Sequence, residues 1–404
     1  MADQVLVNCN VFDGHGGAVL TDQRIVIRDG RIAALGAGDP ALEGGAAVID
    51  VGGAYVMAGL FNMHTHFSLA LPGALGREVL AMSPYELAFY VADGARRTLR
   101  CGVTSVRCVG ESDHVEFALR SAIAAGRAEG PRIFTAGRAL VCTGGHGHEA
   151  PSALECDGPD GFTHGTRAQI KAGADLIKVM ISGGIAGLNE AIDTMPLTPA
   201  ELDAVIRTAH AWGRKVTAHA GPAPIIEQAV ELGLDCVEHG YQLTAAVARQ
   251  MRDRGAALVP TLGVTRCADF FDSLEVPAWM QRRSFAAAPR HEESYRLALA
   301  AGVEVMLGSD LPPFWPVDGT SATVRELEHM QEFGLPARDA LLAATRGPAA
   351  WLGVDHDVGS VAVGKRADLI AMTADPTASV GALRTLFWVM KDGMVVRDDR
   401  RERE

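Results

Sequence analysis

The sequence predicts an α/β protein, a (β/α)8 TIM barrel with a small composite β-sandwich domain that is formed by both termini. Residues 58–357 alternate apolar, β-rich runs with alanine-rich helical patterns, which is typical of a parallel sheet covered by helices. Both ends of the chain are instead rich in short strands with glycine turns. The length of 404 residues allows one barrel of about 250 residues together with an accessory domain.

The small domain is predicted to combine residues 1–57 with residues 358–404. In the first segment, two alternating apolar runs within 24–35 flank an Asp-Gly dipeptide, which is a strong signal for a β-hairpin. The second segment repeats the order of strand, Asp-Gly and strand at 391–396. Because the two segments share this pattern, we expect them to form one domain with the barrel inserted between them.

The barrel segment, residues 58–357, contains eight candidate strands separated by helical patterns. The clearest helix start is at Thr198, a threonine cap followed by proline and then by glutamate three residues on. Functional groups of a (β/α)8 barrel lie at the carboxyl ends of its strands, so the residues that end these runs are the candidates for the functional site. The candidate strands are 58–66, 103–109, 132–136, 175–181, 215–220, 235–239, 257–262 and 303–309.

Composition and charge restrict the partners and the compartment. The formal net charge of −12 argues against nucleic acid and anionic membrane surfaces, because both select basic faces. The seven cysteines are scattered without a C-x-x-C pair, which favours a reducing compartment. The sequence shows no signal-peptide pattern, and no uncharged run approaches the roughly 18 residues that span a bilayer. We therefore expect a cytoplasmic protein.

A His-X-His pair, His64 and His66, ends the first barrel strand. Side chains alternate between the two faces of a strand, so these two imidazoles point the same way and can reach one metal ion. Taken alone, the pair is equally compatible with two histidines in a polar loop. The rest of the chain favours the metal site, because it supplies further ligand candidates at the ends of other strands.

The further candidates each lie at or near the end of another predicted strand. Each has an ordinary explanation: a strand-end histidine is often hydrogen-bonded, a strand lysine often extends to solvent, and an aspartate after Gly-Ser often caps a helix. Their occurrence in the order His-X-His, Lys, His, His, Asp on five different strands is hard to explain residue by residue, and it indicates a metal site. The candidates are Lys178, His219, His239 and Asp310.

This order of residues resembles the amidohydrolase superfamily over nearly the whole chain. The stretch 359–369, GSVAVGKRADL, is similar to the superfamily's return strand into the small β-domain. The stretches 173–184 around Lys178 and 144–147, GGHG, resemble the branch that holds Xaa-Pro and related dipeptidases and ochratoxin-hydrolysing amidases. The resemblance implies that Lys178 reacts with CO₂ to form a carbamate that bridges two divalent metal ions, most often Zn²⁺.

The resemblance also implies a division of the ligands. His64, His66 and Asp310 hold one metal ion, and His219 and His239 hold the other. A free lysine is a cation that repels metal ions, whereas a carbamate is an anion with one oxygen for each metal. Histidine nitrogen and carboxylate oxygen suit zinc, although manganese and cobalt stay open. Asp310 is the expected catalytic group that moves a proton from the attacking water to the leaving nitrogen.

Substrate recognition is expected from two residues near the strand ends. In the resembling peptidases, a histidine and a tyrosine at the places of His146 and Tyr241 contact the substrate's carbonyl and α-carboxylate. His148 is an alternative to His146, and core packing is an alternative role for Tyr241. The segment 263–292 is long for a barrel loop and is expected to act as a lid.

These inferences predict a metal-dependent amidohydrolase that cleaves the amide bond of dipeptides or N-acyl amino acids with a free α-carboxylate. The partner is a small-molecule amide or dipeptide, and the resemblance implies a homo-oligomer. One alternative is a cyclic-amide hydrolase or deaminase of the imidazolonepropionase type, whose mononuclear members lack the bridging lysine. A non-catalytic protein that has lost its metals is a further alternative, which the complete ligand set disfavours. The leaving amino acid, the physiological metal and the oligomeric state stay open.

Overall fold

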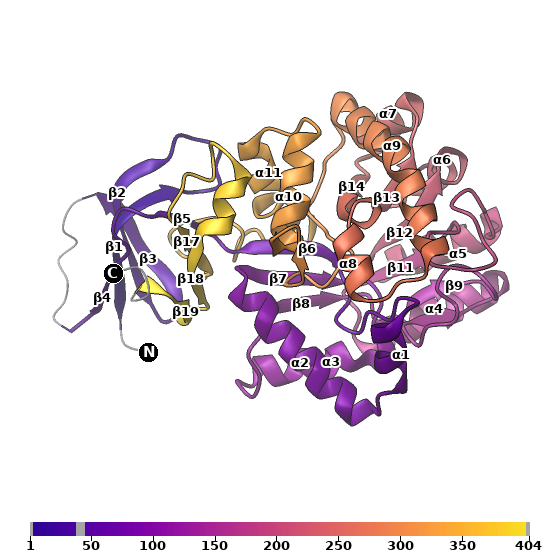
Figure 1. The fold of residues 1–404 in the computed structure, drawn as a ribbon, viewed down its shortest axis with the longest axis horizontal. Coiled ribbons are helices and arrows are strands. Elements are labelled where there is room, and N and C mark those ends of the chain that lie inside the picture. The colour runs from indigo at the N-terminus through magenta and orange to yellow at the C-terminus, as the bar shows by residue number, and fades with distance from the viewer. Residues whose placement is uncertain (1–2, 38–44, 401–404) are drawn as a thin grey trace.

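The computed structural model describes residues 3–37 and 45–400. It has two parts, a barrel of parallel strands surrounded by helices and a β-rich domain to which both ends of the chain contribute (Figure 1). The predicted fold class is therefore confirmed. Strand β5 of the β-rich domain ends at Ala58 and barrel strand β6 begins at Leu60, while the predicted domain boundaries stay a prediction.

The β-rich domain is built on one eight-stranded sheet with the order β19-β18-β17-β5-β1-β2-β3, in which β4 also pairs with β1. Asp29 and Gly30 both have positive φ, 50° and 77°, which is the geometry of the tight hairpin turn that the Asp-Gly pattern predicts. Asp392 and Gly393 repeat it between β18 and β19. The strands are β1 (Gln4–Phe12), β2 (Leu20–Arg28), β3 (Arg31–Ala37), β4 (Ala47–Asp50), β5 (Tyr55–Ala58), β17 (Leu369–Met372), β18 (Leu386–Lys391) and β19 (Met394–Asp398).

The barrel strands form two parallel sheets, β6-β7-β8 and β10-β9-β11-β12-β13-β14. A hydrogen bond from the Asp175 amide to the Thr135 carbonyl, 2.8 Å long, links β8 to the start of β11. The strands are β6 (Leu60–Thr65), β7 (Val103–Cys108), β8 (Arg132–Thr135), β9 (Ala139–Val141), β10 (Ala153–Glu155), β11 (Leu176–Met180), β12 (Lys215–Pro222), β13 (Cys236–Gln242) and β14 (Ala257–Val259). Seven of the eight predicted strand segments thus contain a regular strand.

The eighth predicted strand, 303–309, closes the barrel without forming a regular ladder. It pairs with β14 through an isolated parallel bridge between Leu258 and Val305. On its other side, the Met63 amide donates to the Leu307 carbonyl at 2.8 Å, and the Asp310 amide donates to the His64 carbonyl at 2.8 Å. The segment therefore lies between β14 and β6 and brings Asp310 next to the His-X-His pair.

Helices lie outside the strands and connect them (Figure 1). Helix α5 begins with the predicted capping box, in which Thr198 and Glu201 exchange side-chain to backbone hydrogen bonds. Short 3-10 turns cover Ser112–His114, Leu262–Thr265 and Val380–Thr385. The helices are α1 (Ala74–Ala81), α2 (Pro84–Arg100), α3 (Val115–Ala124), α4 (Gly158–Ala172), α5 (Pro199–Ala211), α6 (Ala223–Leu232), α7 (Ala245–Arg254), α8 (Ala268–Ser273), α9 (Ala278–Ala301), α10 (Ala322–Glu332), α11 (Ala337–Ala343) and α12 (Arg346–Trp351).

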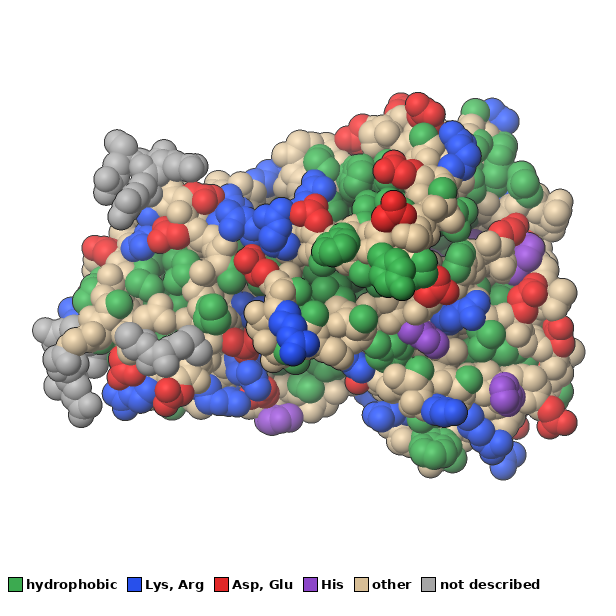
Figure 2. Space-filling model, turned by 90° about the horizontal axis from the view of Figure 1, so that it is seen from below, with side chains coloured by type: hydrophobic (Ala, Val, Ile, Leu, Met, Phe, Trp, Pro, Cys, Tyr) green, Lys and Arg blue, Asp and Glu red, His purple; other side chains and the backbone are tan. Residues whose placement is uncertain are grey.

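The surface mixes both signs of charge with exposed hydrophobic side chains on the face that Figure 2 shows. Several large apolar side chains are exposed, among them Leu80 and Leu188 in the barrel part. None of the helices within the described ranges is both long enough and apolar enough to cross a membrane.

Candidate metal centre

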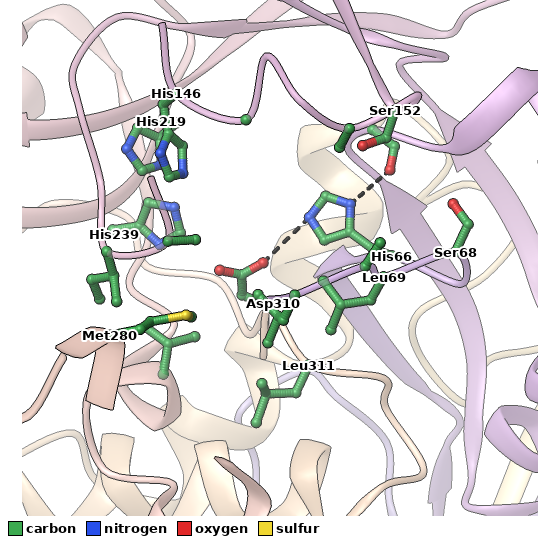
Figure 3. A pocket seen from close by; sticks show the side chains of 18 of the residues that line it. His66, Ser68, Leu69, His146, Ser152, His219, His239, Met280, Asp310 and Leu311 are labelled. Atoms are coloured by element: carbon green, nitrogen blue, oxygen red, sulfur yellow. Dashed lines mark hydrogen bonds and ion pairs between the residues drawn. The ribbon is translucent and has the colours of Figure 1, made fainter. Parts of the chain in front are cut away.

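The residues predicted as ligands come together at the carboxyl ends of the barrel strands. The ligand atoms of His64, His239 and Asp310 lie within 4.8 Å of one another, which makes them a potential metal-binding group. His66 joins this group, because its Nε2 atom is 3.3 Å from Oδ1 of Asp310, and Nε2 of His64 is 3.1 Å from the same oxygen. Figure 3 shows Asp310 between His66 and the stacked rings of His146 and His219. The ring of His219 also contacts that of His239, with centroids 4.7 Å apart.

Every histidine of the cluster uses one ring nitrogen as an anchor and turns the other towards the site. This arrangement is typical of metal-binding histidines, whose second nitrogen is held by a carboxylate, a carbonyl or a hydroxyl group. The donor set therefore fits divalent metal ions. The anchoring pairs are His64 Nδ1 to Glu238 Oε2 at 2.7 Å, His66 Nδ1 to Gly110 O at 2.7 Å, His219 Nε2 to Gly183 O at 2.9 Å, and His239 Nδ1 to Thr261 Oγ1 at 2.7 Å.

Lys178 is buried in the middle of β11 with 1% of its surface exposed. Among the described residues, none forms a hydrogen bond or an ion pair with its ammonium group. Burial lowers the pKa of Lys178, while the charges of Glu238 and Asp310 act in the opposite direction, which shows that the lysine lies beside the cluster. A buried, unpartnered lysine costs folding free energy, so its environment suits a modified or metal-bound form.

Strained backbone occurs at three residues of the site, one within β13, one just after β14 and one just after segment 303–309. His239, Thr261 and Asp310 have φ of 65°, 52° and 53°, in the left-handed region that side chains other than glycine rarely adopt. Threonine is β-branched and is especially disfavoured there. Such strain costs about 1–3 kcal/mol per residue and concentrates at functional sites. It turns the two predicted ligands and the Thr261 anchor towards one point.

Burial and charge set the protonation of the cluster. Burial holds the pKa of His219 and of His239 well below the usual value, so both rings are neutral and can bind a cation. Burial alone raises the pKa of Asp310, but contact with His64 and His66 outweighs this effect and holds the pKa well below its usual range. The cluster therefore combines the neutral imidazoles of His219 and His239 with the ionised carboxylate of Asp310, whose contact outweighs burial and raises the pKa of His66.

A pocket opens above the cluster, and both predicted substrate contacts line it. His146 lies against His219, with ring centroids 4.2 Å apart. Tyr241 stacks on His239 at 5.0 Å, and its hydroxyl has no hydrogen-bond partner within the described part of the chain. His148, the alternative to His146, is not among the lining residues and instead donates a hydrogen bond to the Gly145 carbonyl. The metal and substrate roles of these residues stay predictions.

The rest of the pocket wall is apolar. The predicted lid segment, 263–292, folds into the 3-10 turn at Leu262–Thr265, helix α8 and the first half of α9. It contributes Phe271 and Met280 to the wall, and Leu311 follows directly after Asp310 (Figure 3). The cavity volume of the pocket is about 160 Å³.

The sequence analysis did not predict the residues that hold His64 and its strand in place. Glu238 is completely buried and accepts hydrogen bonds from His64, Arg107 and Thr217. Arg107 is also completely buried and donates to the Met63 carbonyl at 2.5 Å. One signal was available, because a charged residue within a fully buried strand needs a partner. The partner itself was not readable, since it lies on another strand.

Glu190 was also missed, and it holds His146. Its Oε1 atom is 2.5 Å from His146 Nδ1 and accepts a hydrogen bond from the Gly187 amide at 3.0 Å. A Cβ atom at Gly184 would come within 2.3 Å of the His146 ring, so glycine is needed for this packing. The loop after β11 is therefore shaped around His146.

The amidohydrolase family profile matches residues 55–397, and the chain therefore belongs to the amidohydrolase family. It is a hydrolase that acts on carbon–nitrogen bonds, in a family that is generally metal-dependent. Ochratoxinase from Aspergillus niger is 27% identical over 361 residues, which cover 80% of this chain and 71% of that protein.

Two solved structures are similar over nearly the full length. A prolidase complexed with N-methylphosphonate-L-proline has a TM-score of 0.90 and 29% identity, covering 98% of this chain and 100% of its own. A Xaa-Pro dipeptidase with bound methionine in its active site has a TM-score of 0.87 and 28% identity, with coverage of 98% and 100%. The superfamily and the branch predicted from the sequence are thus confirmed.

Proposed function

We propose that this chain is a binuclear metal amidohydrolase that cleaves the amide bond of a dipeptide or of an N-acyl amino acid with a free α-carboxylate. The observation that carries the proposal is the convergence of four histidines, Asp310 and an unpartnered buried lysine at one end of the barrel. Three of these histidines and Asp310 line the pocket. The similarity to ochratoxinase and to a prolidase supports the type of bond and the free carboxylate.

The proposed ligands follow the division that the resemblance implies. His64, His66 and Asp310 would hold one divalent ion, His219 and His239 the second, and Lys178 as its carbamate would hold both. Nitrogen and carboxylate donors in this number favour Zn²⁺. Bound there, two divalent ions would polarise the scissile carbonyl and lower the pKa of a water molecule towards neutrality.

The protein's own groups would perform the proton transfer and the orientation of the substrate. Asp310 accepts a proton from the attacking water and passes it to the leaving nitrogen. His146, held by Glu190, and the unpartnered hydroxyl of Tyr241 bind the substrate's carboxylate. The wall that the lid segment provides excludes bulk water and so strengthens these electrostatic contacts.

The imidazolonepropionase-type alternative is weaker, because a mononuclear enzyme leaves Lys178 buried without a role.

We also propose that the enzyme works in the cytoplasm on a small molecule, as a homo-oligomer, with no nucleic-acid or membrane partner. All seven cysteines are free thiols, which supports a reducing compartment.

The test measures kcat/KM for an N-acyl amino acid and for the same compound with its carboxylate amidated. We expect amidation to lower kcat/KM about ten- to a hundredfold, because it removes a hydrogen bond to a charged group worth about 1.5–3 kcal/mol. In His146→Ala this difference should largely disappear, since the partner is already lost.

His148→Ala is the matched control, because it removes a histidine from the same loop that does not line the pocket. This variant should retain the full effect of amidation. If amidation lowers kcat/KM by the same factor in His146→Ala as in the wild-type enzyme, His146 does not contact the carboxylate. Metal analysis that returns one equivalent or none per chain, after loading with zinc and bicarbonate, would refute the binuclear site.

A further inference from the structure

A second hollow continues from the mouth of the active-site pocket over the surface. We call it the outer groove and define it by the residues that line it beyond the pocket, chiefly Leu80, Leu188 and Trp279. The pocket and the outer groove are continuous because they share five lining residues. These shared residues are Ala70, Leu71, Gly147, Ala150 and Ala186.

The outer groove is apolar where a barrel surface is ordinarily polar. Leu80 at the end of α1 is 50% exposed, and Leu188 in the loop after β11 is 66% exposed. The two leucines come from different strand-to-helix connections and face the same hollow. Grouped exposed apolar side chains beside a pocket indicate a ligand-binding surface.

We propose that the outer groove binds the acyl part of the substrate, and that the enzyme prefers N-acyl amino acids whose acyl group is long and apolar. This inference rests on the proposed function. His146 and the buried Tyr241 take the carboxylate, so the amino acid occupies the interior of the pocket. The acyl group on the other side of the scissile bond then extends through the mouth into the outer groove.

The charges around the site favour an acylated substrate over a free dipeptide. A dipeptide carries an ammonium group one carbon from the scissile carbonyl, and this cation requires an acidic partner. Among the described residues that line the pocket, Asp310 is the one carboxylate, and it is engaged by His64 and His66. The outer groove adds one charge of each sign, Arg77 and Glu149. An N-acyl group avoids burying an unpaired cation.

The test compares N-acetyl-, N-hexanoyl- and N-octanoyl-L-leucine with leucyl-leucine on the zinc-loaded enzyme. We expect kcat/KM to rise at least tenfold from the acetyl to the octanoyl compound. The octanoyl compound has six more methylenes than the acetyl compound. Each fully buried methylene contributes roughly 0.8 kcal/mol, which is about fourfold in kcat/KM, so a tenfold rise requires only partial burial of the chain. The dipeptide should be cleaved more slowly than the hexanoyl compound.

A double variant and a control variant test whether the outer groove causes this preference for long acyl chains. Leu80→Gln and Leu188→Gln, combined, should lower the octanoyl-to-acetyl ratio of kcat/KM by about three- to tenfold. Met394→Gln is the matched control, because Met394 is similarly exposed, at 60%, and lies on strand β19 of the β-rich domain. It should leave the ratio unchanged. A flat chain-length series, or a ratio that the leucine variants do not alter, would overturn the inference.

A binding experiment separates this inference from the proposed reaction. Asp310→Asn protein, which lacks the proton-transfer group, is titrated calorimetrically with the acetyl and octanoyl compounds in the presence and absence of the two leucine substitutions. Octanoyl binding that is tighter by about tenfold and depends on the leucines supports the outer groove even if the wild-type enzyme cleaves neither compound. Turnover of both compounds with equal affinity would support the reaction and overturn the groove.

Discussion

Among the single residues of this enzyme, Lys178 has the environment that an ordinary lysine tolerates least. It is buried in β11, and no anion forms an ion pair with it inside the described ranges. Nearby Glu238, which has the charge to neutralise it, is already hydrogen-bonded to His64 and paired with Arg107. A buried cation without a partner is strongly destabilising, whereas a carbamate between two metal ions is neutralised.

We predict that Lys178→Ala lowers metal content from about two equivalents to one or fewer per chain and abolishes most activity. A short carboxylic acid at high concentration should restore part of both, since it supplies the missing pair of oxygens. Lys215→Ala is the control, because Lys215 begins the neighbouring strand and donates to the Trp351 carbonyl away from the site. Metal analysis and kcat on zinc-loaded protein measure the effect. Wild-type metal content and activity in Lys178→Ala would show an ordinary strand residue.

At the scale of secondary structure, the period of the sequence predicted where the strands end, and thereby which side chains meet. His219 ends one apolar run and His239 the next, and parallel pairing of β12 with β13 brings both to the same end of the barrel. The sequence could not predict Glu238 as the anchor of His64. The two residues are 174 positions apart, and only the closed barrel brings them into contact.

The eighth strand shows a second limit of the pattern. Residues 303–309 have the apolar character of a strand, yet they form an isolated bridge rather than a ladder. This segment packs closely against its neighbours on both sides at Gly308. A Cβ atom there would come within 2.8 Å of the His64 backbone nitrogen and within 2.4 Å of Val259. Hydrophobic periodicity carries no information about such contacts between distant segments.

Helix α3 carries a buried carboxyl group that provides a test of stability. Glu116 lies in its first turn and accepts a hydrogen bond from Thr135 at 2.8 Å, while its other oxygen has no partner among the described residues. Burial and, after it, the charge of Glu111 raise the pKa of Glu116 to about 7. A carboxyl with a raised pKa contributes its full stability below the unfolded pKa near 4.5 and loses it as pH rises through 7.

We therefore predict that Glu116→Gln stabilises the protein increasingly as pH rises from 5 to 8, by as much as about 3 kcal/mol. Glutamine keeps the acceptor for Thr135 but has no charge to bury. Glu129→Gln, which changes a glutamate in a loop outside the helices, should give no such pH-dependent gain. Urea unfolding at pH 5 and at pH 8 measures the difference. An equal effect of Glu116→Gln at both values would contradict a protonated Glu116.

For the whole molecule, an ion-pair network joins the barrel to the β-rich domain. Arg132 of β8 contacts Asp368 at 2.7 Å and Asp392 at 2.9 Å, and Asp392 lies in the turn between β18 and β19. Asp368 has a side chain that is only 4% exposed. Arg132 uses one terminal nitrogen for each carboxylate and therefore connects β8 to residues more than two hundred positions further along the chain.

The contribution of this network to the free energy of unfolding should decrease in acid. Burial raises the pKa of Asp392, but Arg132 and Lys391 outweigh it and lower the pKa to about 2. A carboxyl with a lowered pKa contributes stability above its unfolded pKa near 3.8 and loses it as pH falls towards 2.

Arg132→Ala should thus destabilise the protein by about 2 kcal/mol at pH 7 and by clearly less at pH 3. Arg132→Lys keeps the charge but lacks a second terminal nitrogen for the second carboxylate, so its stability should lie between those of the wild-type protein and Arg132→Ala. Urea unfolding of the wild-type protein and the two variants at both pH values measures this effect. An unchanged stability of Arg132→Ala at pH 7 would show that the ion pairs of Arg132 do not stabilise the protein.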